Sequence, residues 1–573
     1  MSLNRVTLFD ITILTLLAIG AGCGLVYEYL LSHYAGRVLG TMEVAIYGIV
    51  TIMLISMGAG SFLSRKIADP YTGFAWLELL LALLGGGSIL IIGGVFALSH
   101  LLPQQIATTF ALPPDLTPSG GFILWMEGVA RTFPYLFAAL LGLLIGMEIP
   151  LIGRIRAELY ADQRRDNPGV IYGVDYIGAG IGAILWLLWM ITMEVTTAAA
   201  LTASLNLLLG LIFWWLFREK VRGATLLLGA NLLVAVSLLQ LFDNGQRWSN
   251  AMEEILYKDH VILQQQTRYQ RLVVTERFIH PAKPPLYTFY INGRTQFASN
   301  DEFIYHALLT YPAMAAAARH EQVLIIGGGD GLALRDLLRW NPQQVTLIDL
   351  DPDLVALFRD PILRQGTVVN QPLLAANKGA FDDPRVKLHF GDAFTAVDPL
   401  LAAEAMFDVI IVDLPDPGHP DLNRLYSSRF YGKLYNLLAG DGVIAIQSTS
   451  PYHARNTFIC IGKTVKESGF SHVEQYHHNV PSFGEWGWTI ATKEGRSPRQ
   501  RLQQLQQLPL ADPWLTRGVL LATFEFGKDF YVGSDAIKIN HLGTMTAYHY
   551  HHQDWMRDLG SGYFQQQNLE KRL

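Results

Sequence analysis

Aspartates follow several predicted strands in the second half of the chain, where their carboxylates could bind positively charged groups and accept protons. Asp330 closes the run VLIIGGGDG at 323–331, in which a predicted strand enters a glycine turn and a helical pattern follows. The turn is similar to a dinucleotide fingerprint, but Leu332 replaces its last glycine and Asp330 would repel a pyrophosphate. A carboxylate there favours a positively charged nucleoside of the S-adenosylmethionine kind.

The stretch VIIVDLPDPGHP at 409–420 places Asp413 and Asp416 at the end of another predicted strand, in a loop stiffened by prolines. An amine with a pKa near about 10 must lose a proton before it can act as a nucleophile, so this acidic loop could both recognise and deprotonate it. Asp349 occupies the position of a ribose-binding acid, and Asp392 could accept from an adenine amino group. Each aspartate alone could equally be a helix cap or a turn residue.

Alternating strands and helices predict an α/β Rossmann-like, doubly wound domain of the methyltransferase type, which would gather these aspartates at one edge of its sheet. A small antiparallel β lid is expected before it, at 260–297, with an Asn292-Gly293 turn. The expected strands are 323–326, 345–350, 386–390, 408–412 and 442–447, and the expected helices are 331–340, 353–363, 427–438 and 454–468.

The first part of the chain has membrane character. The 573 residues are 51% hydrophobic, and the apolar excess lies before residue 243. A net charge of −6 with scattered basic residues gives no nucleic-acid footprint, and the two cysteines, Cys23 and Cys460, exclude a disulfide framework. About seven spans are expected, at 9–32, 42–63, 74–99, 124–150, 170–192, 197–217 and 223–242.

Basic residues follow the second, fourth and sixth spans, which indicates that these loops and the N-terminus are cytoplasmic. An odd number of spans would then place the second half outside the cell, where an adenosyl co-substrate is not normally supplied. We favour a cytoplasmic catalytic half, with one segment miscounted or re-entrant, in a multi-pass protein of the cell (inner) membrane. The basic residues are Arg65, Lys66, Arg154, Arg156, Arg164, Arg165, Arg218, Lys220 and Arg222.

Four acidic residues fall within or at the ends of these spans, where a charge is costly enough to suggest a role. The alternative for each is a carboxylate at the headgroup level or one paired with a loop arginine. They are Glu28, Glu78, Glu148 and Asp175.

Several motifs of the second half together carry a resemblance to a known family. Residues of about 265–490 resemble the spermidine synthase (polyamine aminopropyltransferase) family, and the stretches 24–40 and 169–185 resemble the membrane portion fused to such domains in bacteria. The tail at 514–555 is similar to tails of that fused branch. The matching motifs are YQRLVV, INGRTQFASNDEFIYH, VLIIGGGDG, DPRVKLHFGDAF, FDVIIVDLPDP and VPSFGEWGW.

The resemblance implies transfer of the aminopropyl group from decarboxylated S-adenosylmethionine, as co-substrate, to an amine such as putrescine, with no metal and no bound cofactor. It implies that Asp413 accepts the proton, that Asp416 faces the acceptor amine, and that His306 and Asp330 hold the aminopropyl amine or the polyamine. It also implies self-association, as in soluble relatives. The implied nucleoside-binding residues are Gln270, Asp349, Asp392, Ala393 and Pro420.

The acceptor end departs from the family pattern. The run Gln447–Pro451 lacks a glutamate, Phe483 lacks a phenol, and Ala307 replaces another glutamate. These losses leave open a lyase or cyclase acting on S-adenosylmethionine without an amine, and a polyamine sensor or transporter is a further alternative. A metal site at His549, His551 and His552 is a less favoured interpretation.

We therefore expect a transmembrane domain at 1–243 and a small β part of the catalytic domain at 244–300. An aminopropyltransferase domain at 301–493 and a C-terminal extension at 494–573 would follow.

Overall fold

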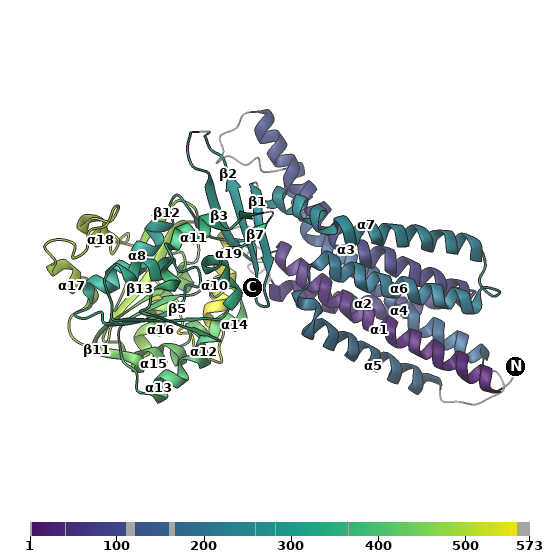
Figure 1. Cartoon of the computed structure of the whole chain (residues 1–573). Helices are drawn as coiled ribbons and strands as arrows, with labels where there is room; N and C mark the ends of the chain where they lie inside the picture. The colour runs from purple at the N-terminus through teal and green to yellow at the C-terminus, as the bar shows by residue number, and fades with distance from the viewer. Residues whose placement is uncertain are drawn as a thin grey trace. The chain divides into compact units, whose positions relative to one another are not determined.

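The computed structural model describes residues 3–39, 42–110, 121–159, 167–257, 259–280, 282–364 and 366–558. It forms two compact units, Met1–Val261 and Ile262–Leu573. The first unit is helical (Figure 1), with α1 (Leu3–Leu39), α2 (Met42–Leu63), η1 (Ser64–Lys66), α3 (Pro70–Thr109), α4 (Gly121–Leu159), α5 (Asn167–Leu188), η2 (Met190–Thr192), α6 (Val195–Phe217) and α7 (Ala224–Tyr257).

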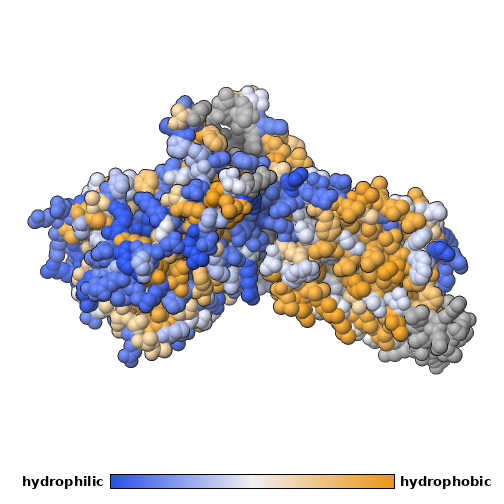
Figure 2. Space-filling model, viewed as in Figure 1, coloured by the Kyte–Doolittle hydropathy of each residue, from blue (hydrophilic) through white to orange (hydrophobic). Residues whose placement is uncertain are grey.

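Seven of these helices are long and apolar enough to cross a membrane, as the sequence predicts. Apolar residues cover most of the visible face of this unit (Figure 2), and Leu188, for example, is 81% exposed. An outward-facing apolar surface suits lipid better than water. The described helices thus agree with a count of seven spans and give no support to the expectation that one span was miscounted. The domain boundary expected at residue 243 falls inside α7, because the chain becomes polar there without ending the helix.

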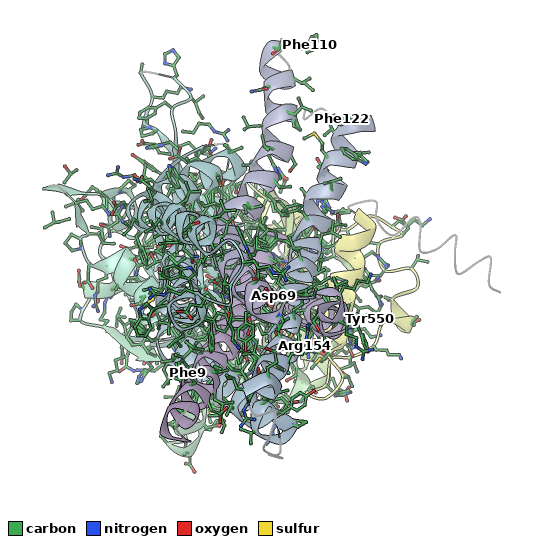
Figure 3. The ribbon with its side chains drawn as sticks, turned by 90° about the vertical axis from the view of Figure 1, so that its right-hand side faces the viewer. Phe9, Asp69, Phe110, Phe122, Arg154 and Tyr550 are labelled. Carbon is green, nitrogen blue, oxygen red and sulfur yellow. The ribbon has the colours of Figure 1, made fainter. Side chains whose placement is uncertain are left out.

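The predicted basic loops lie at one end of the helical unit. The Arg154 guanidinium donates to the carbonyls of Ile67 at 2.6 Å and Ala68 at 3.0 Å, close to Asp69 (Figure 3). Asp69 in turn lies 3.7 Å from Arg222, after α6. These contacts bring three of the loops together, as expected for loops on one side of a membrane. Arg164 and Arg165 lie outside the described residues.

The second unit begins with a four-stranded sheet in the order β1-β2-β3-β4, in which β2, β3 and β4 pair antiparallel, as the sequence predicts for a small β element before the main sheet. Its β3–β4 turn has Asn292 at φ 51° and Gly293 at φ 78°, the left-handed pair that a tight hairpin requires. The strands are β1 (His260–Gln266), β2 (Arg271–Arg277), β3 (Leu286–Ile291) and β4 (Arg294–Ala298).

A seven-stranded sheet of order β12-β13-β11-β10-β5-β6-β9 forms the centre of this unit. Neighbouring strands from β11 to β9 pair in parallel, whereas β13 and β12 are antiparallel. The strands are β5 (Gln322–Gly327), β6 (Gln344–Asp349), β9 (Val386–Phe390), β10 (Phe407–Asp413), β11 (Leu438–Gln447), β12 (His472–Val480) and β13 (Gly484–Thr492).

Both faces of the sheet are buried, as in a doubly wound fold. Alternate residues of β5 and β10 enter two separate hydrophobic cores, because successive side chains of a strand point to opposite faces. Val323, Ile325, Val409 and Ile411 belong to one core, and Leu324, Ile326, Ile410 and Val412 to the other.

Helices complete the unit. Those that pack on the sheet include α8 (Glu302–Ala316), α9 (Leu332–Leu338), α10 (Pro352–Arg359), α15 (Ser428–Leu437) and α16 (Arg455–Glu467). The expected helix 353–363 ends at Arg359, since Pro361 disfavours helical backbone at Asp360. The smaller elements are β7 (Leu363–Arg364), β8 (Thr367–Val368), α11 (Gln371–Asn377), η3 (Ala380–Asp382), α12 (Ala393–Ala396), α13 (Asp398–Ala402), α14 (Pro420–Asn423), η4 (Arg424–Tyr426), α17 (Pro498–Gln504), α18 (Arg517–Ala522), η5 (Ser534–Ala536) and α19 (Thr546–Asp558).

Candidate active site

The sheet brings the predicted aspartates to one edge. Strands β10, β5 and β6 are parallel neighbours, and Asp413 is registered against Gly327. Asp330 follows β5, and Asp349 is the last residue of β6. The carboxyl ends of adjacent parallel strands coincide, so these three carboxylates surround the position where ligands bind in such sheets.

The glycine turn allows this close approach. A Cβ at Gly327, where φ is 82°, would lie 2.0 Å from the backbone oxygen of Asp413. A Cβ at Gly329 would lie 2.8 Å from Oδ2 of Asp349. Larger residues would therefore push the three loops apart.

Asp413 is oriented by a tyrosine that the sequence reasoning did not single out. The Tyr305 hydroxyl on α8 donates to Oδ1 of Asp413 at 2.6 Å. Burial, together with Asp330, raises the pKa of Asp413 to about 6, although His306 and the Tyr305 hydrogen bond act to lower it. At neutral pH the Asp413 carboxylate is therefore ionised and can accept a proton. Tyr305 directly precedes His306 in the sequence, but the motif predicts a role in the site for the histidine only.

His306 lies one turn after Glu302 on α8 and is 2% exposed. Its Nδ1 lies 3.0 Å from Oε2 of Glu302, which also receives Arg335. Burial alone would lower the pKa of His306, but the hydrogen bond and the charge of Glu302 raise it to about 9. The imidazole is thus a cation at neutral pH, close enough to Asp330 and Asp413 to interact with both charges.

Asp330 itself accepts a hydrogen bond from the backbone N–H of Leu332 at 2.9 Å through Oδ1. Burial raises the pKa of this carboxyl, and the charge of His306 opposes the rise. A cationic ligand would further favour its ionised form.

Asp416, the residue expected to face the acceptor amine, is held by three side chains. Its Oδ1 accepts from the Gln447 amide at 2.6 Å, and its Oδ2 accepts from the Thr449 hydroxyl at 3.0 Å. The third is His551, whose Nε2 lies 3.2 Å from Oδ2 and also 3.0 Å from the indole N–H of Trp555. Burial would raise the pKa of Asp416, but His551 and Gln447 lower it, so the group is an anion.

Two features of this acceptor end were not predicted. Thr449 adopts φ 63°, a strained conformation for a β-branched residue, and this conformation accompanies its hydrogen bond to Asp416. His551 comes from α19, in the C-terminal extension, where the sequence reasoning considered histidines only as metal ligands. The run AYHYHHQDW was the available signal, but nothing in it indicated the fold of the tail over the sheet edge.

The residues expected to hold a nucleoside include Asp349, at the end of β6, and Gln270, between β1 and β2. Oδ1 of Asp349 accepts from the Asp351 backbone N–H at 2.8 Å, and burial raises the pKa of Asp349 to about 6. Gln270 donates to Oδ2 of Asp351 at 3.0 Å, so it is positioned through a second acid that the sequence reasoning passed over. Asp351 was visible as the middle aspartate of DLDPD.

The expected adenine end lies beside Asp349, because the Gly391 N–H donates to the Asp349 carbonyl at 2.9 Å. Asp392 caps α12 by accepting from Phe394 N–H, and its Oδ2 lies 2.8 Å from Arg424. Both its oxygens therefore have protein partners. Ala393 is the buried first residue of α12, and Pro420 is the first residue of α14.

The chain is similar to known proteins over most of its length. A family model described as the spermine/spermidine synthase domain matches residues 302–503. The chain is 52% identical to a polyamine aminopropyltransferase of Shewanella oneidensis, over 97% of this chain and 96% of the relative. A polyamine aminopropyltransferase of Oceanobacillus iheyensis is 31% identical, over 88% and 90%.

A solved spermidine synthase, in complex with the transition state analogue AdoDATO, is also similar. It is 25% identical with a TM-score of 0.41, over 47% of this chain and 87% of that chain. The relative from Shewanella matches through both the helical and the catalytic unit. With that near-complete match, the chain belongs to the polyamine aminopropyltransferase family and is an enzyme of that family.

Proposed function

We propose that the enzyme transfers the aminopropyl group of decarboxylated S-adenosylmethionine to putrescine, giving spermidine and methylthioadenosine. The observation that carries this proposal is the placement of Asp413 and Asp330 on neighbouring loops, with the Asp413 carboxylate fixed by Tyr305 at 2.6 Å. Such an arrangement suits a substrate with positive charge and a nitrogen that must lose a proton.

In the proposed reaction, the acceptor ammonium first gives a proton to the Asp413 carboxylate. The freed nitrogen lone pair then forms a bond to the carbon next to sulfur, and the carbon–sulfur bond breaks with its electrons moving to sulfur. Methylthioadenosine leaves as a neutral thioether, so the protein needs mainly to align the two reactants. Asp349, with Gln270, Asp392, Ala393 and Pro420, would hold the nucleoside.

We propose that Asp330 binds the ammonium of the aminopropyl group. The sequence suggested that His306 shares this task, but an imidazole with a pKa of about 9 would repel an ammonium. His306 suits a positioning role instead, because its charge favours the ionised forms of Asp330 and Asp413.

The distal ammonium of putrescine would lie against Asp416. This carboxylate already accepts from Gln447 and Thr449 and lies beside His551, which leaves one free lone-pair direction on Oδ1 for a ligand. A single anion with restricted access favours a short diamine over a longer polyamine.

Mass spectrometry of the products tests the proposal directly. Purified full-length protein receives S-adenosylmethionine or its decarboxylated form, each with and without putrescine. We expect methylthioadenosine and spermidine only from the decarboxylated donor with putrescine. Methylthioadenosine formed without an amine, or from S-adenosylmethionine itself, would replace the transferase with a lyase or cyclase.

We also propose that the helical unit anchors the enzyme in the cell membrane with the catalytic unit in the cytoplasm, where the donor is supplied. With seven spans, this orientation opposes the one that the basic loops favour. A C-terminal green fluorescent protein fusion should fluoresce, and a C-terminal alkaline phosphatase fusion should be inactive. The reverse pattern would place the catalytic unit outside.

A further inference from the structure

A group of buried polar side chains lies between the apolar helices of the first unit. Glu78 of α3, Glu148 of α4, Asn206 of α6 and Asn231 of α7 are each at most 3% exposed. We call these four residues the helical polar cluster. Burial of so many polar groups among helices of membrane-spanning length is costly and therefore suggests a function.

The members of the cluster are close to one another. The Asn206 amide donates to Oε2 of Glu78 at 2.9 Å. A Cβ built on Gly210, one turn after Asn206, would lie 3.2 Å from Cβ of Glu78 and 3.7 Å from Oδ1 of Asn231. Glu148 approaches the same part of α6, because a Cβ built on Gly20 would lie 3.0 Å from Oε2 of Glu148 and 3.8 Å from Leu209, the residue before Gly210.

Several oxygens of the cluster have no hydrogen-bond donor among the described residues. They are Oε1 of Glu148, Oδ1 of Asn206 and Oδ1 of Asn231, and all are acceptors. The amide group of Asn231 is oriented by its own donation to the Leu227 carbonyl at 2.8 Å, and Asn206 is oriented by Glu78. The two amide oxygens are thus fixed in place, and a ligand that satisfies all three oxygens must supply hydrogens or positive charge.

The described part of the helical unit offers no basic side chain to these acids. Neither Glu78 nor Glu148 has an ion pair with a described lysine, arginine or histidine, whereas the buried Arg156 lies 2.6 Å from Asp10. Two carboxylates without a counter-charge in an apolar surrounding must be neutralised by protons or by a bound cation.

We propose that the helical polar cluster binds a cation, coordinated by the oxygens of Glu78, Glu148, Asn206 and Asn231. The ligand class is a cation recognised through oxygen atoms, supplied either as the ammonium group of an amine or as an alkali metal ion. Carboxylate and amide oxygens are hard ligands, and such ligands suit both an alkali metal ion and an ammonium group. This site is separate from the proposed transferase site and does not depend on it.

Thermal unfolding of the full-length protein in lipid nanodiscs provides the test, in choline chloride buffer without the sulfonium donor. Putrescine, sodium and potassium are titrated separately at constant ionic strength. We expect at least one of them to raise Tm of the wild type with increasing concentration, as a ligand of the folded state does. In Glu148→Gln and in Asn231→Ala the apparent affinity should fall at least tenfold.

Two controls make the result specific. Glu219→Gln, at an exposed position after α6, should retain the wild-type response. Asp416→Asn weakens amine binding in the catalytic unit, so a putrescine response that survives this change but is lost in Glu148→Gln belongs to the helical unit. If Glu148→Gln does not fold, equilibrium dialysis with radiolabelled cation should show fewer bound cations for Asn231→Ala than for wild type.

The proposal is overturned if none of the three cations changes Tm of the wild type, which would mean that protons alone neutralise the acids. It is equally overturned if the cation response, or the number of bound cations, is the same in the cluster variants as in the wild type.

Discussion

In the catalytic unit, the aspartates at the strand ends accept hydrogen bonds from the protein, whereas in the helical unit Oε1 of Glu148 has no donor among the residues that the structure describes. Asp413 accepts from Tyr305, Asp330 from Leu332 N–H and Asp416 from Gln447. The amide oxygens of Asn206 and Asn231 likewise have no donor among the described residues. Glu78 does accept from Asn206, so the contrast between the two units lies in these three unpartnered oxygens.

The difference reflects what each region has to do. A reacting carboxylate must be held in one position with its charge controlled, because catalysis depends on alignment and on proton affinity. A binding site can leave its acceptors unpaired until a cation arrives, at a cost to the stability of the empty protein. Variants at the two sites should therefore change different quantities: rates in the catalytic unit and cation-dependent stability in the helical unit.

The largest effect is expected for Asp413→Asn, which preserves the shape of the side chain but removes its ability to take a proton. The rate of methylthioadenosine formation from decarboxylated S-adenosylmethionine and putrescine should fall by about 10²–10⁴-fold. Single-turnover kinetics measures this loss. Asp441→Asn changes an aspartate near the start of β11, at the opposite edge of the sheet, and should retain the wild-type rate. An unchanged rate in Asp413→Asn would remove its proposed role.

A buried acid that is paired with a basic side chain should lose stability when it is neutralised, in contrast to Glu148. Asp10 lies 2.6 Å from Nε of Arg156, and both side chains are less than a tenth exposed. Asp10→Asn removes the negative charge that lies 2.6 Å from this buried guanidinium, so the free energy of unfolding should fall by about 3–5 kcal/mol. Unfolding of the nanodisc-reconstituted protein measures the change.

Arg222→Gln is the matched control for that variant, because its pair with Asp69 spans 3.7 Å and the Arg222 side chain is 86% exposed. It should cost at most about 1 kcal/mol. Equal losses for Asp10→Asn and Arg222→Gln would show that burial does not set the strength of these pairs.

Tyr305→Phe tests how the catalytic unit controls charge. Asp413 must be ionised to accept a proton, so the rate should fall as pH drops through its pKa of about 6. Burial and the charge of Asp330 raise this pKa, whereas the charge of His306 and the Tyr305 hydrogen bond lower it. Removal of this hydrogen bond should shift the acidic limb of the pH–rate profile upward, by up to about one pH unit. An acidic limb that does not move, or moves downward, would show that Tyr305 does not tune Asp413.

Much of this catalytic edge was predictable from the sequence. The glycine turn and the polar residues after strands located Asp330, Asp349 and Asp413, because parallel strands align their carboxyl ends. Strands β12 and β13 were not predicted, since runs such as HVEQYHHNV and GEWGWTIAT mix polar and aromatic residues without a clear alternation. The contact of His551 with Asp416 was not predictable either, as it joins residues separated by 135 positions.

In the helical unit the outcome was similar. Hydropathy located the seven helices, and the rarity of buried charge singled out Glu78 and Glu148. Asn206 and Asn231 were not singled out, because an asparagine in an apolar helix is not unusual enough by itself. Their importance depends on which helix faces meet, and periodicity alone does not specify that arrangement.

His551→Ala tests whether the C-terminal extension limits the acceptor. The substitution removes the imidazole beside Oδ2 of Asp416. This frees a lone pair of that oxygen and leaves space at the distal end of the proposed amine site. The kcat/KM for a diamine one methylene longer than putrescine should rise relative to putrescine by about tenfold, the usual value of one methylene. Competition between the two diamines measures this ratio.

His549→Ala is the control, because His549 lies on the same helix but is exposed. It should keep the wild-type preference. An unchanged ratio in His551→Ala would show that the extension supports the fold without selecting the acceptor.

The smallest expected effect is a gain in stability on substitution, whereas most substitutions at buried positions destabilise a protein. In choline buffer without other cations, Glu148→Gln should stabilise the protein by about 1 kcal/mol, because it replaces a buried ionisable group that has no ion-pair partner among the described residues with a neutral amide. Addition of the bound cation should narrow this gap, since the wild type binds the cation more tightly and gains more stability from it. The two melting curves, recorded with and without cation, measure both parts. A variant less stable than the wild type in cation-free buffer would mean that Glu148 already has a compensating partner, and the contrast between the two units would then disappear.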